Sequence, residues 1–466
     1  MGRIVFVGGG FVGMCAATML ANDGHDVTVL ERDPTPPPTP DTAWDVWDRR
    51  GVNQFRLMHF LLARFRQVAD AELPGLTDAM MAAGALRMNP LHSIPDEVTG
   101  GSRAGDERFE SVTARRPVSE SVVAAFAAST SGLTIRRGIA VTGLITEVGP
   151  AGVVHVGGVR TDAGDDIKAD LVVDASGRRS SVPGWLRESG SPGPEETIDD
   201  SGFVYYGRHF RSGDGSVPPL FGGLLQPYGS VSVLTLPADN GTWGVGFVTS
   251  SKDAALRGLS KSDCWERVLR AYPFVAHWCD GEPMTDVQVM AKIEDRQRNY
   301  IVNEAPVATG IVPLADSWAC TNPSLGRGIS IGMMHATALR SVLREVPLDD
   351  HLQVASQFGQ VTEEKIEPYF ADTLSFDRHR LAEIEAVVAG HTYETDDPSW
   401  NLGNALANSV GRDPDLLRGF MGIVSVLDRG VDVLSRPGLA EKAIALADAT
   451  PLPGPDRHEL LALIGA

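Results

Sequence analysis

A cluster of glycines close to the N-terminus restricts the chain to a narrow set of folds. Residues 3–7, RIVFV, have the length and pattern of a short buried strand, and GGGFVG at 8–13 follows them at once. Residues 14–22 are rich in alanine, methionine and leucine, as in a helix, and 25–30 form a second strand-like run that ends at Glu31. This order of strand, GxGxxG, helix, strand and acid is typical of a dinucleotide-binding βαβ unit.

Each part of this motif has a physical role. Gly8 permits the tight turn, Gly10 lets backbone amides approach a pyrophosphate, and Gly13 lets the helix pack against the strand. The helix N-terminus supplies partial positive charge to the phosphates, and Glu31 is placed to accept hydrogen bonds from ribose hydroxyls. The residues predicted to contact the cofactor here are Gly8, Gly10, Phe11, Val12, Gly13, Glu31 and Arg32. FAD and NAD share this unit, so the motif leaves both open.

Composition excludes several classes of function. The formal net charge of -19 argues against non-specific binding of nucleic acid. The four cysteines fall in no metal-ligand spacing and are too few for a disulfide framework, so we predict no metal site and a reducing, cytoplasmic location. No apolar run reaches the roughly 18 residues that span a bilayer. The glycines inside the apolar N-terminus argue against a signal peptide.

The rest of the chain contains a strand-rich middle part and a helical C-terminal part. Residues 200–250 alternate like strands, 260–276 and 43–69 have helical patterns, and the composition is helical from about residue 330 onward. Ser119 is a candidate N-cap of a further helix. No second GxGxxG follows the first, so a separate NAD(P)H-binding Rossmann domain is not expected.

Two later segments complete a family pattern. They are DLVVDASGRRSSVPGWL at 170–186 and PLADSWACTNPSLGRGISIG at 313–332. Together with GGGFVG they resemble the FAD-dependent monooxygenases of the aromatic-hydroxylase type and the related flavin-dependent halogenases and styrene or indole epoxidases. The resemblance extends from residue 1 to about residue 345.

The resemblance implies a fold and a domain order. We expect an α/β protein with a Rossmann-like FAD-binding domain, an inserted β-sheet substrate domain and a helical C-terminal tail. The expected boundaries are 1–190 and 295–345 for the FAD-binding domain (with 80–110 partly on the substrate side), 191–294 for the substrate domain and 346–466 for the tail. The tail either caps the active site or places Asp377, Arg378 and Arg380 in surface ion pairs.

The third motif carries most of the residue assignments that follow from the resemblance. The family has Gly-Asp, then a proline seven residues and a glycine twelve residues after the aspartate, which Asp316, Pro323 and Gly328 match. Asp316 would bind the ribityl chain, and the amides around Gly328 and Ile329 would face the N1 and O2 edge of the flavin. Ala315 replaces the family's glycine, a change that a negative φ would tolerate.

Further cofactor contacts are implied in the same way. Arg116, rather than the neighbouring Arg115, matches an arginine that contacts the flavin or its phosphates. The remaining expected cofactor-binding residues are Asp174, Gly177, Pro323 and Gly326.

Several reactions stay open. A monooxygenase would insert one oxygen atom into an apolar, aromatic or polycyclic small molecule through a flavin C4a-hydroperoxide. NADH or NADPH would supply electrons directly or through a partner flavin reductase. A dehydrogenase or reductase would only move hydride. A halogenase is disfavoured, because GTWGVGFV at 241–248 lacks the second tryptophan and the proline of the halogenase signature. A flavin-binding protein without oxygenase activity is the remaining alternative.

Substrate contacts are expected from the β-rich segment and from 49–64, which resembles a segment that runs near the flavin in related oxygenases. Because side chains alternate across a strand, part of each strand faces the flavin. The candidates are Tyr205, Tyr206, Arg208, Trp243 and Phe247, with Gln54 and His59 from the earlier segment. Each strand residue could equally belong to the core on the other face of the sheet. His59 is the one catalytic candidate, and a core histidine is its alternative.

Overall fold

A five-stranded parallel sheet forms the centre of the N-terminal part. The computed structural model describes residues 1–49, 51–52, 54–149 and 152–465. The strands lie in the order β21-β9-β1-β2-β5, and every neighbouring pair is parallel. They are β1 (Arg3–Val7), β2 (Asp26–Glu31), β5 (Leu133–Arg137), β9 (Leu171–Asp174) and β21 (Ile311–Pro313). Their carboxyl ends meet at one edge, where ligands bind in sheets of this type.

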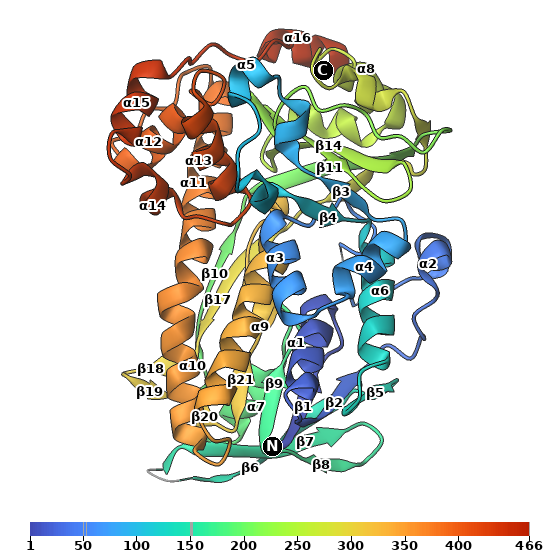
Figure 1. Ribbon diagram of the computed structural model, residues 1–466, viewed down its shortest axis with the longest axis vertical. Helices are drawn as coiled ribbons and strands as arrows, with labels where there is room; N and C mark the ends of the chain where they lie inside the picture. The colour runs from blue at the N-terminus through green and yellow to red at the C-terminus, as the bar shows by residue number, and fades with distance from the viewer. Residues whose placement is uncertain (50, 53, 150–151, 466) are drawn as a thin grey trace.

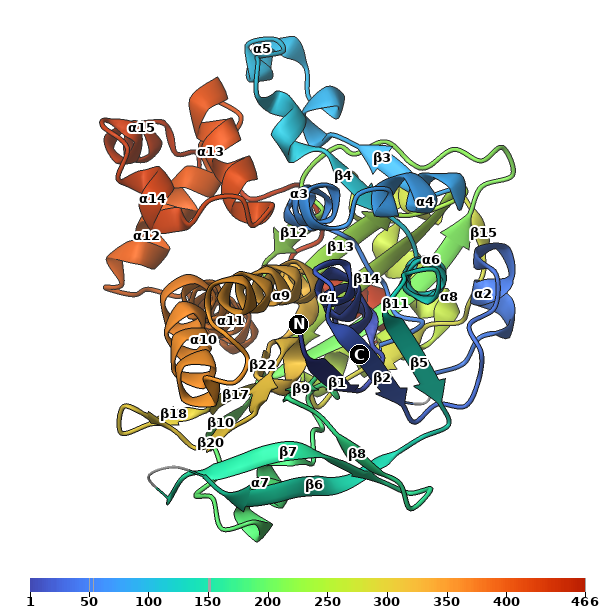
Figure 2. The same ribbon diagram turned by 60° about the horizontal axis from the view of Figure 1, so that its bottom comes forward.

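Two layers cover this sheet (Figures 1 and 2). Ile4 and Phe6 of β1 pack into a helical layer, whereas Val5 and Val7 pack against a small second sheet. The helical layer contains α1 (Phe11–Asn22), α3 (Ala63–Glu72), α4 (Leu76–Ala82), α6 (Arg116–Ala128) and α9 (Gly328–Glu345). The small sheet contains β6 (Val141–Val148), β7 (Val154–Thr161), β8 (Asp166–Lys168) and β20 (Ala308–Thr309). Burial on both faces explains why β1 is apolar from Ile4 to Val7.

One antiparallel pair of strands connects the β-rich segment to the first part of the chain, at both the start and the end of that segment. After α7 (Val182–Glu188), β10 (Glu195–Asp200) pairs antiparallel with β17 (Glu294–Asn299), which also pairs with β22 (Ala319–Cys320). Between β10 and β17 lies a six-stranded sheet of β11 (Phe203–Arg211), β12 (Leu225–Tyr228), β13 (Val231–Pro237), β14 (Thr242–Ser250), β15 (Glu282–Pro283) and β16 (Gln288–Met290). The strands expected in 200–250 are confirmed as β11, β13 and β14. The helix expected at 260–276 is shorter, since α8 covers only Ser262–Leu269.

Helices dominate the chain after α9. They are α10 (His351–Lys365), α11 (Glu367–Ala389), α12 (Pro398–Ala407), α13 (Pro414–Val424), α14 (Gly430–Leu434), α15 (Leu439–Leu446) and α16 (Arg457–Ile464). Figure 1 shows α12 to α15 gathered beside the six-stranded sheet, whereas α16 lies beside α8. The predicted class, an α/β fold with a Rossmann-like sheet, an antiparallel β-sheet and a helical tail, is confirmed. In the part of the chain that the structure describes, no helix is both long and apolar enough to cross a membrane.

Two local predictions are wrong. Ser119 does not cap a helix, because α6 begins at Arg116 with Pro117 in its first turn, and the Ser119 hydroxyl donates to the Arg116 carbonyl at 3.0 Å. The helical pattern of 43–69 is also interrupted: α2 (Pro40–Val46) ends early and α3 starts only at Ala63. The apolar side chains between them, such as Trp47 and Phe55, are buried without a helix.

Candidate cofactor and substrate site

One large cavity begins at the carboxyl edge of the parallel sheet and continues between the six-stranded sheet and the C-terminal helices. Its volume is about 2600 Å³. Small-molecule sites usually measure roughly 300–1,000 Å³. The cavity therefore has room for a dinucleotide and a second molecule together.

The glycine motif builds one end of this cavity. Gly8 has φ +98°, and a Cβ atom there would lie 2.7 Å from the Ala175 carbonyl oxygen. A Cβ at Gly13 would lie 2.9 Å from the Ala175 side chain, so this glycine sets the distance between α1 and the turn after β9. No described residue lies within 4 Å of a Cβ built on Gly10, which leaves open space in front of the α1 N-terminus. Phe11 and Val12 line the cavity as well.

Glu31 lies at the cavity wall inside a buried charge network. One carboxylate oxygen accepts from the Gly9 amide at 2.9 Å and from Arg49 at 2.7 Å. The other accepts only from the Asp33 amide, at 2.9 Å, among the described residues. A carboxylate oxygen has two acceptor positions, so Glu31 retains capacity for a ligand hydroxyl.

Arg49 is a residue of the site that the sequence did not reveal. Besides Glu31, its guanidinium contacts the buried Glu120 at 2.6 Å, and Glu120 also pairs with Arg116 at 2.7 Å. Burial raises the pKa of Glu120, but the charges of Arg116 and Arg49 outweigh it and the pKa is lowered. Arg49 lies between α2 and α3, in a segment that was expected to be helical, and its partners Glu31 and Glu120 are far from it in the sequence, so no local signal indicates these contacts. Arg32, by contrast, was predicted and does line the cavity.

The second motif, residues 170–186, contributes a turn to the cavity wall, whereas its acidic residue Asp174 does not reach the cavity. Asp174 is fully buried, does not line the cavity, and accepts from the Ser176 and Ser180 hydroxyls at 2.5 Å each. The expectation that Asp174 contacts the cofactor is therefore corrected, because its carboxylate is used to hold the turn. Ser176 and Gly177 of that turn do line the cavity.

The third motif, residues 313–332, lines another wall of the same cavity. Ala315 has φ +53°, so the condition of a negative φ under which alanine would replace glycine without strain is not met. Asp316 lines the cavity, and no hydrogen bond to its carboxylate is found among the described residues. Burial raises the pKa of Asp316, and the nearby charges of Arg116 and Arg178 oppose this rise.

The residues after Asp316 shape the wall next to it. Pro323, Gly326 and Ile329 line the cavity. Helix α9 begins at Gly328, where a Cβ would meet no described residue within 4 Å. An open helix N-terminus and an acceptor without a partner are the groups that a flavin with its ribityl chain requires. The residues present therefore fit FAD.

The structure separates the two adjacent arginines. Arg115 forms a buried ion pair with Asp239 at 2.7 Å and lies over the Trp44 ring, away from the cavity. Arg116 lines the cavity. Of the two, only Arg116 is placed to meet a cofactor.

Gln54 and His59 also line the cavity. The His59 Nε2 atom is buried and has no hydrogen-bond partner in the part of the chain that the structure describes. Burial, together with the positive charge of Arg116, lowers the pKa of His59 to about 3. A neutral imidazole is therefore expected at physiological pH.

Most strand candidates for substrate contact face away from the cavity. Tyr206 pairs across the sheet with Phe247, and both belong to a buried cluster with Trp243 that packs on α8. Arg208 is on the same face, 3.7 Å from Glu266 of α8. The predictions for Tyr206, Arg208, Trp243 and Phe247 are thus wrong, because all four residues belong to the core on the far face of the sheet.

Tyr205 is on the other face and does line the cavity. Its hydroxyl donates to Asn322 at 2.5 Å, and Asn322 and Ser324 both donate to Asp377 at 3.0 Å. Asp377 is 3% exposed, so it is not a surface residue, and burial raises its pKa to about 7. Arg380 is buried as well, while Arg378 forms a long exposed pair of 3.6 Å with Asp199.

The fold matches solved flavoproteins. A probable FAD-dependent monooxygenase, PqsL of Pseudomonas aeruginosa, superposes with a TM-score of 0.59 at 14% identity, over 82% of this chain and 98% of PqsL. The flavin-dependent halogenase CmlS gives 0.58 at 17% identity, over 93% and 78% of the two chains. A flavoprotein/dehydrogenase from Cytophaga hutchinsonii gives 0.59 at 15% identity, over 100% and 98%. The chain has the fold of the FAD-dependent monooxygenase superfamily that its motifs resemble.

Sequence comparison places the chain more narrowly. Residues 7–37 match the family described as NAD(P)-binding Rossmann-like domain. Protein Rv3254 of Mycobacterium tuberculosis is 30% identical over 362 residues, which cover 73% of this chain and 72% of that protein. The chain belongs to the same family as Protein Rv3254.

Proposed function

We propose that this protein is an FAD-dependent monooxygenase that inserts one oxygen atom into an apolar, aromatic or polycyclic small molecule. The observation that carries the proposal is the continuity of the cavity, which joins the glycine cradle of α1 to a second, mostly apolar space under the six-stranded sheet. An apolar space with few polar groups suits an apolar substrate.

The chain's own residues have distinct tasks in this proposal. The α1 N-terminus and Glu31 would hold the adenosine diphosphate half of FAD, and the Asp316 carboxylate would accept a hydrogen bond from a ribityl hydroxyl. The open N-terminus of α9 at Gly328 stabilises negative charge on the ring that is bound there. When bound, FAD supplies the electron transfer and oxygen activation that side chains cannot perform. Tyr205 and the walls around it orient the substrate and exclude water.

The electron donor and the location are part of the proposal. NADH or NADPH would reduce the flavin directly or through a partner flavin reductase. All four cysteines are buried free thiols, which supports a reducing compartment such as the cytoplasm.

Hydride transfer without oxygen insertion is the second candidate, because one structural neighbour is described as a flavoprotein/dehydrogenase. Halogenation is not favoured: the neighbour CmlS shares the fold, but the halogenase signature is incomplete around Trp243.

Purified protein tests the proposal. The expected result is a yellow protein that binds FAD and consumes oxygen when NADH, NADPH or free reduced FAD is added in parallel reactions. With an apolar aromatic substrate, mass spectrometry under ¹⁸O₂ should show one labelled oxygen atom in the product. Efficient anaerobic turnover with an artificial electron acceptor and no label in the product would favour hydride transfer. A protein that binds no FAD would overturn both candidates.

A further inference from the structure

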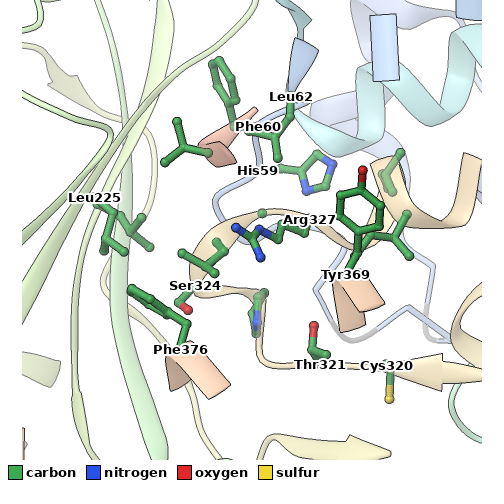
Figure 3. A pocket seen from close by; sticks show the side chains of 18 of the residues that line it. His59, Phe60, Leu62, Leu225, Cys320, Thr321, Ser324, Arg327, Tyr369 and Phe376 are labelled. Carbon is green, nitrogen blue, oxygen red and sulfur yellow. The ribbon is translucent and has the colours of Figure 1, made fainter. Parts of the chain in front are cut away.

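Arg327 projects into the substrate half of the cavity. Figure 3 shows its guanidinium between His59 and Tyr369 on one side and Leu225, Ser324 and Phe376 on the other. The residue lies between Gly326 and Gly328, immediately before α9, so its backbone is held by the third motif. Its position is therefore set by the same turn that contacts the proposed flavin.

This guanidinium is buried without a counter-ion. Arg327 is 9% exposed and donates one 3.3 Å hydrogen bond to the Thr373 hydroxyl, and its Nε has no partner among the described residues. Among described residues no carboxylate lies within 4.0 Å of it, whereas the other buried arginines each have one. Those paired arginines are Arg49, Arg208, Arg298, Arg340 and Arg380.

The nearest acids do not neutralise it. Asp372 is engaged by Arg429 at 3.1 Å, and Asp377 accepts from Asn322 and Ser324. Burial lowers the pKa of Arg327, and the charges of Asp372 and Asp377 offset only part of this effect. An isolated buried charge is costly unless a partner arrives.

We propose that Arg327 binds the anionic group of the substrate, so that the substrate is an apolar molecule carrying a carboxylate or a similar acidic oxygen group. The planar guanidinium has donors left for such a group, and pairing by two parallel hydrogen bonds would fix its orientation. Phe60, Leu62, Leu225 and Phe376 surround the apolar body. This inference rests on the proposed function, since it names the substrate class of the same cavity.

A second source of negative charge lies nearby. A reduced flavin bound at the α9 N-terminus would also carry an anionic oxygen, and Arg327 is next to Gly328. The experiment must therefore distinguish a substrate anion from the flavin itself.

Paired fluorescent probes test the assignment on the protein with its FAD. 8-Anilino-1-naphthalenesulfonate carries an anionic group, and N-phenyl-1-naphthylamine is the same aromatic body without it. In R327Q the anionic probe should bind about tenfold more weakly, the loss expected for one charge-assisted contact. The neutral probe should change less than about twofold. R327K should recover part of the binding.

R378Q is the matched control. It removes the same formal charge from the same part of the molecule, but Arg378 is on α11 outside the cavity and its side chain is 70% exposed. It should leave the affinities of both probes unchanged. Equal weakening of both probes in R327Q, or no change in either, would contradict the proposal. A shifted FAD midpoint potential in R327Q with an unchanged preference for the anionic probe would assign the charge to the flavin instead.

A displacement experiment on the unaltered protein tests the same inference if R327Q does not fold. In the unaltered protein, anthracene-9-carboxylate should displace N-phenyl-1-naphthylamine at a concentration at least tenfold lower than anthracene-9-carboxamide does. Equal displacement by the acid and the amide would overturn the inference. Because these probes report binding alone, loss of oxygen consumption would count against the proposed function and not against Arg327.

Discussion

Ala315 has a left-handed backbone conformation, which glycine adopts at a lower cost in free energy than alanine does. L-residues pay roughly 1–2 kcal/mol in the left-handed region, and φ here is +53°. Ala315→Gly removes this strain but makes the unfolded chain more flexible, at a cost of roughly 0.4–1 kcal/mol. We expect the free energy of unfolding to stay equal or rise by up to about 1.5 kcal/mol, measured by urea denaturation.

The control is an alanine in ordinary helical backbone. Ala125 is exposed in α6, and Ala125→Gly should lower the free energy of unfolding by about 1 kcal/mol. A315G destabilising the protein as much as A125G does would show that the backbone at 315 is not strained.

Asp316 offers a second test at the residue scale. Asp316→Ala should weaken FAD binding roughly 10- to 100-fold, because a hydrogen bond to a charged group contributes about 1.5–3 kcal/mol. Arg211→Ala should change little, since Arg211 forms an exposed pair with Glu282 at 2.9 Å, outside the cavity. Isothermal titration of the apoprotein with FAD measures both. Equal FAD affinity in the two variants would remove Asp316 from the site.

At the scale of elements, α9 supports the loop that carries Asp316. His335 of α9 is fully buried, and its Nδ1 accepts from the Ala315 amide at 3.2 Å. Its Nε2 lies 3.0 Å from the Thr362 hydroxyl of α10, which itself donates to the Phe358 carbonyl. The imidazole therefore carries its proton on Nε2 and is neutral, and burial lowers its pKa to about 3.

This histidine makes stability depend on pH in a defined direction. The folded state binds the proton more weakly than the unfolded state, whose histidine pKa is about 6.5. The neutral His335 therefore makes its full contribution to the free energy of unfolding above about pH 6.5. This contribution is lost progressively as pH falls toward 3. His335→Gln should remove this term, because glutamine can accept and donate at the same two positions without titrating.

The measurement is the difference in the free energy of unfolding between the wild type and H335Q. As pH falls from 7 to 5, the wild type should lose about 2 kcal/mol of free energy of unfolding relative to H335Q. Other titrating groups, such as His59, occur in both proteins and cancel in the difference. A constant difference over this range would show that His335 is not held neutral by the fold.

At the scale of the whole molecule, the end of the chain returns to the β-rich segment. Leu460 of α16 is 1% exposed and packs in the same cluster as Trp265 of α8. Leu460→Ala should lower the free energy of unfolding by about 2–5 kcal/mol, as for other leucines removed from a core.

The matched control is Leu446→Ala. Leu446 is in α15 and is 38% exposed, so its loss should cost at most about 0.5 kcal/mol. Urea denaturation followed by tryptophan fluorescence reports on both, because Trp265 is in the affected cluster. Equal effects of the two substitutions would show that α16 is not part of the core.

Much of the FAD-binding half could be predicted from sequence because its signals are local. Gly8 with φ +98°, the α1 start and Glu31 fall within one βαβ unit, where spacing along the chain determines spacing in the fold. The third motif was also predictable in position, although the resemblance could not report the positive φ of Ala315.

The sequence by itself therefore determined the class of fold, the glycine cradle and the segments that meet around a cofactor, since strand, turn and helix signals act over a few residues. Only the tertiary structure decided which face of each strand is inward, placing Tyr205 at the cavity and Tyr206 in the core. It also brought Asp377 to Asn322 and left Arg327 without a counter-ion among the described residues. These contacts join residues far apart in the chain, and burial and charge pairing between such residues arise only when the separate elements pack together.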